Sequence, residues 1–164
     1  LLKTKINRNS DTYYYVLFSH GPSGDPHFMI FEDGRFDKPV FTVYALKLYI
    51  NGSGNIYAEG HTNNLYNERR KFQLKNGEFI ETEQPFYYVG LETVTNTSIK
   101  LYKTEQMNEV VARLPKNYSV EVLLNKKDTQ LFLIKTDFGL TGWYKPEHMM
   151  YGMEDIKGLY YAGD

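Results

Sequence analysis

Three Asx-Gly dipeptides punctuate the first half of the chain and constrain its fold more than any other feature: Asp33-Gly34, Asn51-Gly52 and Asn76-Gly77. These residue types tolerate positive φ, which the type I′ turn of a tight β-hairpin requires at both central positions. The segments between the dipeptides therefore read as strands joined by short turns. We expect strands at residues 12–19, 27–32, 40–50, 55–59, 67–75 and 78–89.

The composition independently favours an all-β fold. The 164 residues include 15 Tyr and 10 Phe, and aromatic side chains suit the half-buried, pleated surface of a sheet. Alanine is scarce, and no long stretch carries apolar positions at the 3.6-residue spacing of an amphipathic helix. The predicted fold class is all-β, with little helix.

The charge balance and the absence of cysteine exclude several functions. A net charge of -1 and a pI near 6.5 give no basic field that would attract a phosphate backbone, so we expect no nucleic-acid partner. Without cysteine the chain has no disulfides, cysteine nucleophiles or Cys-ligated zinc. No apolar run approaches the length that spans a bilayer, so no transmembrane segment is expected. We predict no cofactor, and the sequence leaves the oligomeric state open.

One hairpin gathers the nearest approach to a carboxylate cluster. Counting outward from Asn76-Gly77 brings Glu78, Glu81 and Glu83 onto one strand, at a spacing that a hydrolase could use for acid and base chemistry. Cross-strand pairing explains the same residues without a substrate and is favoured. The predicted pairs are Lys75 with Glu78, Leu74 with Phe79, Phe72 with Glu81 and Arg70 with Glu83.

Two histidines flank the only loop that resembles a metal or catalytic site. His20 and His27 stand on either side of a turn that contains Asp25. A neutral histidine in a polar loop is commoner than a metal ligand, so we predict no metal site and no catalytic residue. A hydrolase that uses this loop or the glutamate hairpin remains the alternative.

The second half of the chain carries a recognisable series of strands. Residues 131–144 read as an apolar strand, a tight turn and a second strand that Gly142-Trp143 opens. Residues 99–103, 110–114 and 119–124 read as strands upstream of it. Over roughly residues 93–151 the series resembles a bacterial SH3-like (SH3b-type) domain. Two positions depart from the family pattern: Tyr102 to Gln106 replace its Asn-x-Arg-x-Gly-Pro sequence, and Leu131 or Phe132 replaces its Trp.

The resemblance implies an organisation and a function. Residues 1–92 would form a small antiparallel β-domain of unassigned family, and residues 93–164 an SH3-like β-barrel with a final strand at 156–161. The polar patch at 93–98 would mark the boundary. Such domains usually serve as noncatalytic binding or scaffolding modules of the bacterial cell envelope, which implies an exported, periplasmic or cell-surface protein. The partner would be a peptide, a protein or a cell-wall glycan.

Two surfaces are the candidates for ligand binding. The resemblance points to the aromatic edge of the barrel, with Tyr102, Tyr118, Trp143 and Tyr144. The polar loop 61–70 adds Tyr66 and Arg69, which could orient a sugar or a peptide. The aromatic runs 13–15 and 86–88 must each place rings on opposite faces of a strand. Rings left outside a core would favour a ligand surface or, as a further alternative, an interface subunit of a larger assembly.

Overall fold

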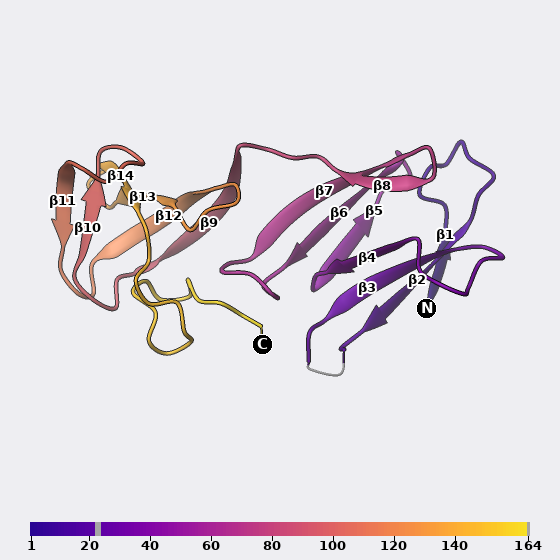
Figure 1. Ribbon diagram of the computed structural model, residues 1–164, viewed down its shortest axis with the longest axis horizontal. Coiled ribbons are helices and arrows are strands. Elements are labelled where there is room, and N and C mark those ends of the chain that lie inside the picture. Colours follow the sequence, from indigo (N-terminus) through magenta and orange to yellow (C-terminus); the bar gives the residue numbers. More distant parts are fainter. Residues whose placement is uncertain (22–23, 164) are drawn as a thin grey trace. The chain divides into compact units, whose positions relative to one another are not determined.

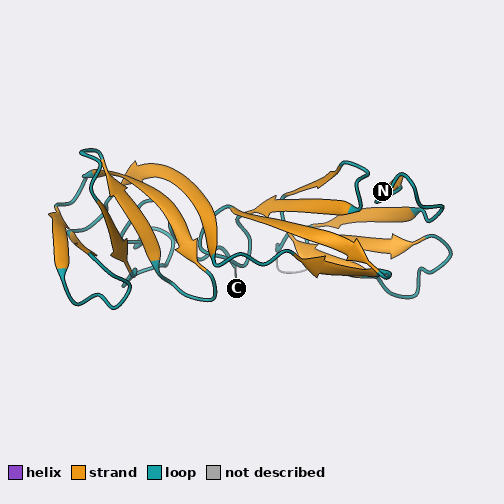
Figure 2. Cartoon of the chain, turned by 90° about the horizontal axis from the view of Figure 1, so that it is seen from above, coloured by secondary structure: helices purple, strands orange, loops and turns teal. Residues whose placement is uncertain are grey.

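All regular structure in the described part of the chain is β (Figures 1 and 2). The computed structural model describes residues 1–21 and 24–163. Within these ranges fourteen strands form three antiparallel sheets, and there is no helix. It follows that the described residues hold no helix long and apolar enough to cross a membrane. The predicted all-β fold class is confirmed.

The chain divides into two compact units. The first comprises Leu1–Asn63, Asn67–Glu83 and Gly163, and the second comprises Asn64–Tyr66 and Gln84–Ala162. The division thus falls ahead of the polar patch at 93–98, and three residues of the 61–70 loop belong to the second unit. The two-domain organisation with its boundary at 93–98 stays a prediction.

Two four-stranded sheets share one core in the first unit. The ring of Phe41 lies 4.8 Å from the ring of Phe72 and 4.9 Å from that of Phe79, which belong to the opposite sheet. Because side chains alternate along each strand, one face of each sheet joins this core and the other is left outside it. One sheet has the order β1 (Leu2–Thr4), β2 (Tyr14–Ser19), β3 (His27–Glu32) and β4 (Phe41–Tyr44); the other has the order β5 (Lys47–Ile50), β6 (Asn55–Gly60), β7 (Glu68–Lys75) and β8 (Glu78–Glu81).

Residues 40–50 form two strands in different sheets, so the prediction of one continuous strand was wrong. The break falls at Ala45 and Leu46, where the chain crosses from β4 to β5. Ala45 is buried, and a Cβ atom added to Gly60 would lie 2.6 Å from the amide nitrogen of Leu46. The corner between β4 and β5 therefore depends on the small size of Ala45 and Gly60. The pattern of apolar residues in the sequence does not reveal this corner.

The hairpin at Asn76-Gly77 has the predicted register. Both turn residues take positive φ, 53° and 85°, as a type I′ turn requires. The ladder ends at Glu81, so the predicted pairing of Arg70 with Glu83 lies beyond it, and Arg70 pairs with Ala58 on the other edge of β7. The confirmed pairs are Lys75 with Glu78, Leu74 with Phe79 and Phe72 with Glu81.

The second unit is built on one six-stranded antiparallel sheet with the order β11-β10-β14-β13-β12-β9. Leu101, Phe132 and Ile134 are fully enclosed in its core. The strands expected from the resemblance are present, whereas a closed SH3-like barrel stays a prediction. The strands are β9 (Phe86–Val94), β10 (Ile99–Tyr102), β11 (Val110–Leu114), β12 (Ser119–Lys126), β13 (Phe132–Thr136) and β14 (Thr141–Tyr144).

Residues 78–89 were also predicted as one strand, and this was wrong. The ladder stops at Glu81 and resumes at Phe86 in a different sheet. Pro85 has no amide hydrogen to donate to a ladder. Its carbonyl oxygen instead accepts a hydrogen bond from the Lys127 amide at 3.1 Å. The break coincides with the division between the two units.

The segment 156–161, expected as a final strand, consists of turns. Isolated bridges pair Thr95 with Ile156 and Asn64 with Ala162. Ile156 and Leu159 are buried in the core of the second unit. The segment therefore contributes apolar burial without a continuous ladder.

Replacing Tyr66 by Ala should destabilise the second unit by about 3–5 kcal/mol, because it empties a buried aromatic site. The Tyr66 ring is 4% exposed, lies 5.9 Å from the Phe132 ring and donates its hydroxyl to Asn125 at 3.4 Å. Urea unfolding followed by the fluorescence of Trp143, the one tryptophan, measures the loss. Tyr66→Phe is the matched control, and an equal loss in that variant would contradict the packing argument.

Candidate functional site

A row of apolar side chains crosses the outer face of the six-stranded sheet. The register places Tyr102 opposite Trp143, Trp143 opposite Leu133, Leu133 opposite Leu124, and Leu124 opposite Tyr88. Residues directly opposite one another share a face, and none of these five side chains packs in the core cluster. Phe86 stands two positions before Tyr88 and faces the same way. We call these six residues, Phe86, Tyr88, Tyr102, Leu124, Leu133 and Trp143, the outer strip.

The outer strip is partly exposed and partly ordered by its own contacts. The Trp143 and Phe86 rings lie 6.1 Å apart with their planes inclined by 37°. Phe86 is 37% exposed and Tyr88 56%. The Tyr88 ring covers Gly90, where an added Cβ atom would lie 2.5 Å from ring atoms. Only glycine at position 90 leaves room for the Tyr88 ring in this position, at one end of the strip.

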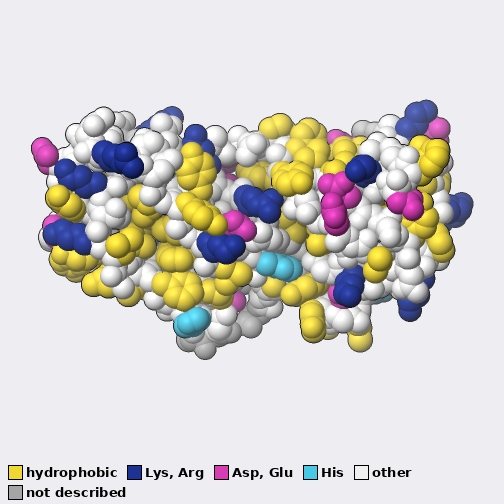
Figure 3. Space-filling view, turned by 180° about the vertical axis from the view of Figure 1, so that it is seen from behind, with side chains coloured by type: hydrophobic (Ala, Val, Ile, Leu, Met, Phe, Trp, Pro, Cys, Tyr) yellow, Lys and Arg dark blue, Asp and Glu magenta, His cyan; other side chains and the backbone are white. Residues whose placement is uncertain are grey.

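One ion pair borders the strip. Lys126, on β12, faces the same side as Leu124 and pairs with Phe86 in the ladder. Its ammonium group forms an ion pair with the carboxylate of Glu105. The margin of the strip beside Phe86 is therefore occupied by a neutral ion pair. On the face of the molecule drawn in Figure 3, hydrophobic side chains likewise lie among basic and acidic ones.

The structure separates the residues that the sequence had grouped as a binding edge. Tyr102 and Trp143 lie together on the outer strip. Tyr144 and Tyr66 are buried in the core of the second unit, at 5% and 4% exposure, which closes their rings to an outside ligand. Arg69 lies in the first unit on β7, exposed and opposite Glu59.

Tyr118 borders a shallow polar depression at the other end of the same sheet. Its hydroxyl hydrogen-bonds the carboxylate of Asp137, which raises the pKa of Tyr118. Glu121 accepts a hydrogen bond from Lys135 at 2.8 Å. The depression has a volume of about 420 Å³ and is lined by Glu92, Thr93, Val94, Ser119, Val120, Glu121, Lys135, Thr136 and Asp137.

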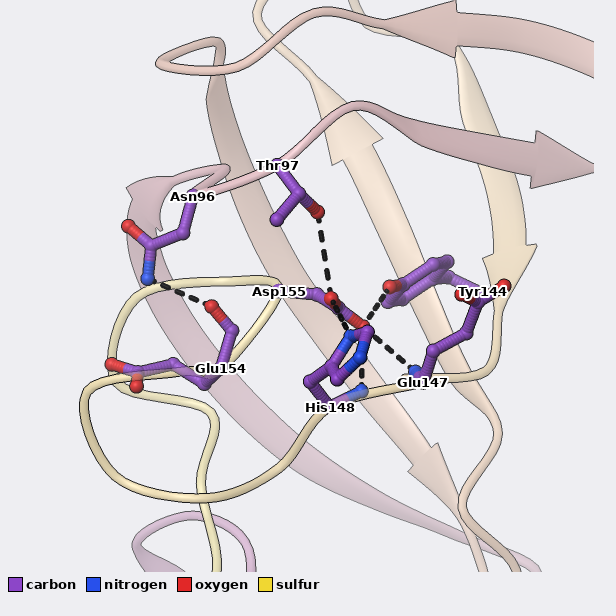
Figure 4. Close-up of polar contacts among 7 residues, drawn as sticks. All are labelled: Asn96, Thr97, Tyr144, Glu147, His148, Glu154 and Asp155. Atoms are coloured by element: carbon purple, nitrogen blue, oxygen red, sulfur yellow. Dashed lines mark hydrogen bonds and ion pairs between the residues drawn. The ribbon is translucent and has the colours of Figure 1, made fainter.

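A buried carboxylate organises the carboxyl-terminal segment of the second unit (Figure 4). Asp155 is 3% exposed. One carboxylate oxygen accepts from the Tyr144 hydroxyl at 2.7 Å and from the amides of Glu147 and His148 at 2.7 and 3.0 Å. The other lies 3.0 Å from Nδ1 of His148 and 3.4 Å from the Thr97 hydroxyl. These contacts tie residues 144–148 to the loop at 96–97.

The hydrogen bonds around Asp155 decide its charge state. Burial by itself would raise the pKa of Asp155, but the bonds from Tyr144, His148 and Glu147 outweigh burial and lower it. Burial and the bond to Asp155 raise the pKa of Tyr144. Asp155 is therefore an ionised acceptor that holds its neighbours in place. The ring of His148 takes part in this arrangement through its contact with Asp155.

The two alternative catalytic sets have ordinary structural contacts. Glu78 stands opposite Lys75 in the hairpin ladder. In the histidine loop, Nδ1 of His27 lies 3.0 Å from the carbonyl oxygen of Asp25; Pro22 and Ser23 lie outside the described residues. Within residues 1–21 and 24–163 no group of three or more His, Asp or Glu side chains could hold a metal. The absence of catalytic residues stays a prediction.

Comparison with protein-family models, curated proteins and solved structures gives no match. The candidate site therefore rests on the geometry of this chain alone. Sequence reasoning missed Leu124, Leu133 and the pairing that brings Phe86 to Trp143. The continuous aromatic run 86–88 was the available signal. Because successive side chains of a strand point to opposite faces, such a run must place at least one ring on the face away from the core.

Asp155→Asn should lower the free energy of unfolding at pH 7 by roughly 1.5–3 kcal/mol, the range for hydrogen bonds to a charged group. The folded-state pKa of Asp155 lies below its ordinary value of 3.8. Its contribution is therefore fully present above that value and is lost as the pH falls through the folded pKa. Urea unfolding between pH 7 and pH 3 measures this loss in the parent chain.

The difference in stability between the parent and Asp155→Asn should accordingly shrink below about pH 4. Asp137→Asn is the matched control, because Asp137 is exposed and should contribute much less. A difference that stays constant down to pH 3 would contradict the ionised state of Asp155.

Proposed function

We propose that the chain is a noncatalytic binding protein of the bacterial cell envelope and that its second unit is an SH3-like barrel. Support for the barrel comes from the ladder, in which β10 pairs with β14 and so brings the first and last strands of residues 99–144 together. An isolated bridge between Thr95 and Ile156 adds one pairing just beyond the end of β9. The envelope location follows from the sequence resemblance, as an analogy from fold.

The outer strip is the observation that carries the proposed function. An antiparallel sheet with one covered face normally presents polar side chains on the other. Here five neighbouring strands each present an aromatic or leucine residue on that face, and these residues are cross-strand partners in one continuous row. Aromatic rings supply large contact area at low entropic cost, which suits a ligand surface.

The shape of the strip favours a glycan over a peptide. The strip follows one level across the sheet, so it offers a long, shallow platform with rings at Tyr102 and Trp143. The apolar faces of sugar rings stack on such aromatic platforms, and their hydroxyl groups remain free for the polar margin. We propose a cell-wall glycan as the ligand, and a wall peptide as the competing ligand in the test.

Tyr102→Ala should weaken the binding of an N-acetylglucosamine oligomer by roughly 30-fold, the effect of removing an aromatic hot spot worth about 2 kcal/mol. Calorimetric titration measures the affinity, and the fluorescence of Trp143 reports contact in the parent chain. A wall stem peptide is titrated in parallel.

Phe138→Ala is the matched control, because Phe138 is an aromatic residue of the second unit that is 84% exposed and lies outside the strip. The proposal predicts no change in that variant. Equal losses in both variants, or binding of the peptide but not of the sugar, would overturn the proposed ligand.

A second candidate function, an interface subunit, is favoured by the outer face of β2 and β3. Tyr15 pairs with Phe31 and Leu17 with Met29. All four are half-buried and none belongs to the core cluster of the first unit. Four apolar side chains in one block suit a protein partner.

Self-association through this block would give a molar mass above that of the 19.2 kDa chain in light scattering, and Leu17→Lys should return the mass to that of the monomer. Thr82→Lys, at an exposed position of the first unit outside this sheet, is the control. A monomeric parent chain at all concentrations would exclude self-association.

A further inference from the structure

The outer face of the second sheet of the first unit combines tyrosine rings with basic side chains. Tyr49 lies opposite Tyr57, which in turn lies opposite Lys71; in the adjoining row Lys47 lies opposite Glu59, which lies opposite Arg69. The alternate positions, such as Leu48, Ile56 and Phe72, enter the core, so these six point to the other side. We call Lys47, Tyr49, Tyr57, Glu59, Arg69 and Lys71 the tyrosine face.

Glu59 organises the tyrosine face. Its carboxylate accepts from the Asn67 amide at 2.9 Å and from the Tyr49 hydroxyl at 3.2 Å, and it lies 3.7 Å from Nζ of Lys47. The hydrogen bond from Asn67 is the main reason why the pKa of Glu59 is lowered. Glu59 therefore stays ionised at neutral pH and holds the Tyr49 ring in one orientation.

The face carries positive charge although the chain as a whole does not. Along its outer positions, four basic residues accompany two acidic ones, an excess of two positive charges, against a net charge of -1 for the protein. Lys75 and Glu78 oppose each other at the hairpin end. Lys71 has no ion pair among the described residues. The excess charge thus lies beside the rings of Tyr49 and Tyr57, which are 48% and 37% exposed.

We infer that the tyrosine face binds an anionic polysaccharide, a chain of sugars that carry carboxylate groups. The paired tyrosine rings offer a platform for the apolar face of a sugar. Lys71, Arg69 and Lys47 surround the platform and can pair with carboxylates. Gln73 stands opposite Asn55 on the same face, where its amide can bond hydroxyl groups.

The same observations favour a polysaccharide over a single-stranded nucleic acid. Nucleic-acid surfaces rely on a broad basic field, whereas the excess here is two charges. Glu59 stands ionised in the middle of the face. A carboxylate there repels phosphodiesters and sugar carboxylates alike, so a bound chain must place an uncharged unit over Glu59. A polysaccharide that alternates charged and uncharged sugars can do so, whereas a uniformly charged phosphodiester backbone cannot. The centre of the face therefore suits a hydroxyl-rich ligand with widely spaced charges.

Binding of an oligomer in which glucuronic acid alternates with uncharged N-acetylglucosamine to the full chain tests this inference. Calorimetry at low ionic strength should show binding that weakens as salt is added, and the methyl ester of the same oligomer should bind at least tenfold more weakly. Lys71→Gln and Tyr57→Ala should each reduce the affinity about tenfold. Circular dichroism shows that the variants are folded.

Two controls separate this face from other surfaces. Lys100→Gln removes an exposed charge of the second unit and should leave the affinity unchanged, and so should Trp143→Ala, since the inference does not depend on the outer strip. Absence of binding, equal binding of the ester, or equal losses in the control variants would each overturn the inference. Tighter binding of oligothymidylate, with the same sensitivity to Lys71→Gln, would assign the face to nucleic acid and overturn it too.

Discussion

Every strand of an antiparallel sheet has two faces, and a chain built from sheets alone must cover one of them with another part of itself. In the first unit two sheets cover each other, and the contact of Phe41 with Phe72 and Phe79 lies at their junction. In the second unit turns of the carboxyl-terminal segment supply Ile156 and Leu159 to the core. Each sheet is then left with one outer face, and the surfaces proposed for binding all lie on such faces.

When turns cover a sheet, some of their backbone amides are left without hydrogen-bond acceptors, and in the second unit Asp155 accepts from two of them. Backbone amides in turns have no ladder partners, and a buried amide without a partner costs free energy. The carboxylate of Asp155 accepts from two such amides, those of Glu147 and His148. Taking this charge out of water is itself costly, and donors on both of its oxygens offset that cost. One acidic side chain thereby accepts hydrogen bonds that, in a sheet, the carbonyl oxygens of a neighbouring strand would accept.

Apolar alternation and turn residues predicted most strands, but not where a strand stops and the chain changes sheet. The failures fall at Ala45, Pro85 and the segment 156–161, where a buried small residue, a missing amide hydrogen and a buried carboxylate decide the structure. The turn dipeptides also differ in geometry: Asn76 takes positive φ, whereas at the other two only Gly34 and Gly52 do. Tertiary contacts at each turn select the conformation that the dipeptide merely permits.

The candidate site could be predicted only in part, for a related reason. Alternation shows that neighbouring rings lie on opposite faces, but it does not show which face is covered. Trp143 and Tyr144 illustrate this, since the first lies on the outer strip and the second in the core. Leucine is usually a core residue, so the identity of Leu124 and Leu133 gives no sign of their outward position. Only the ladder, with the bulge between Val122 and Leu124, shows that they face outward.

The two proposed surfaces should respond to solution conditions in different ways. The outer strip is apolar, and Lys126 at its margin is paired with Glu105, so added salt should change its affinity for an uncharged ligand little. The tyrosine face depends on an excess of positive charge beside exposed rings, and salt screens such charges over about 8–10 Å at physiological concentrations. The two outer faces therefore differ chemically, and we propose the outer strip for uncharged sugars and the tyrosine face for acidic ones.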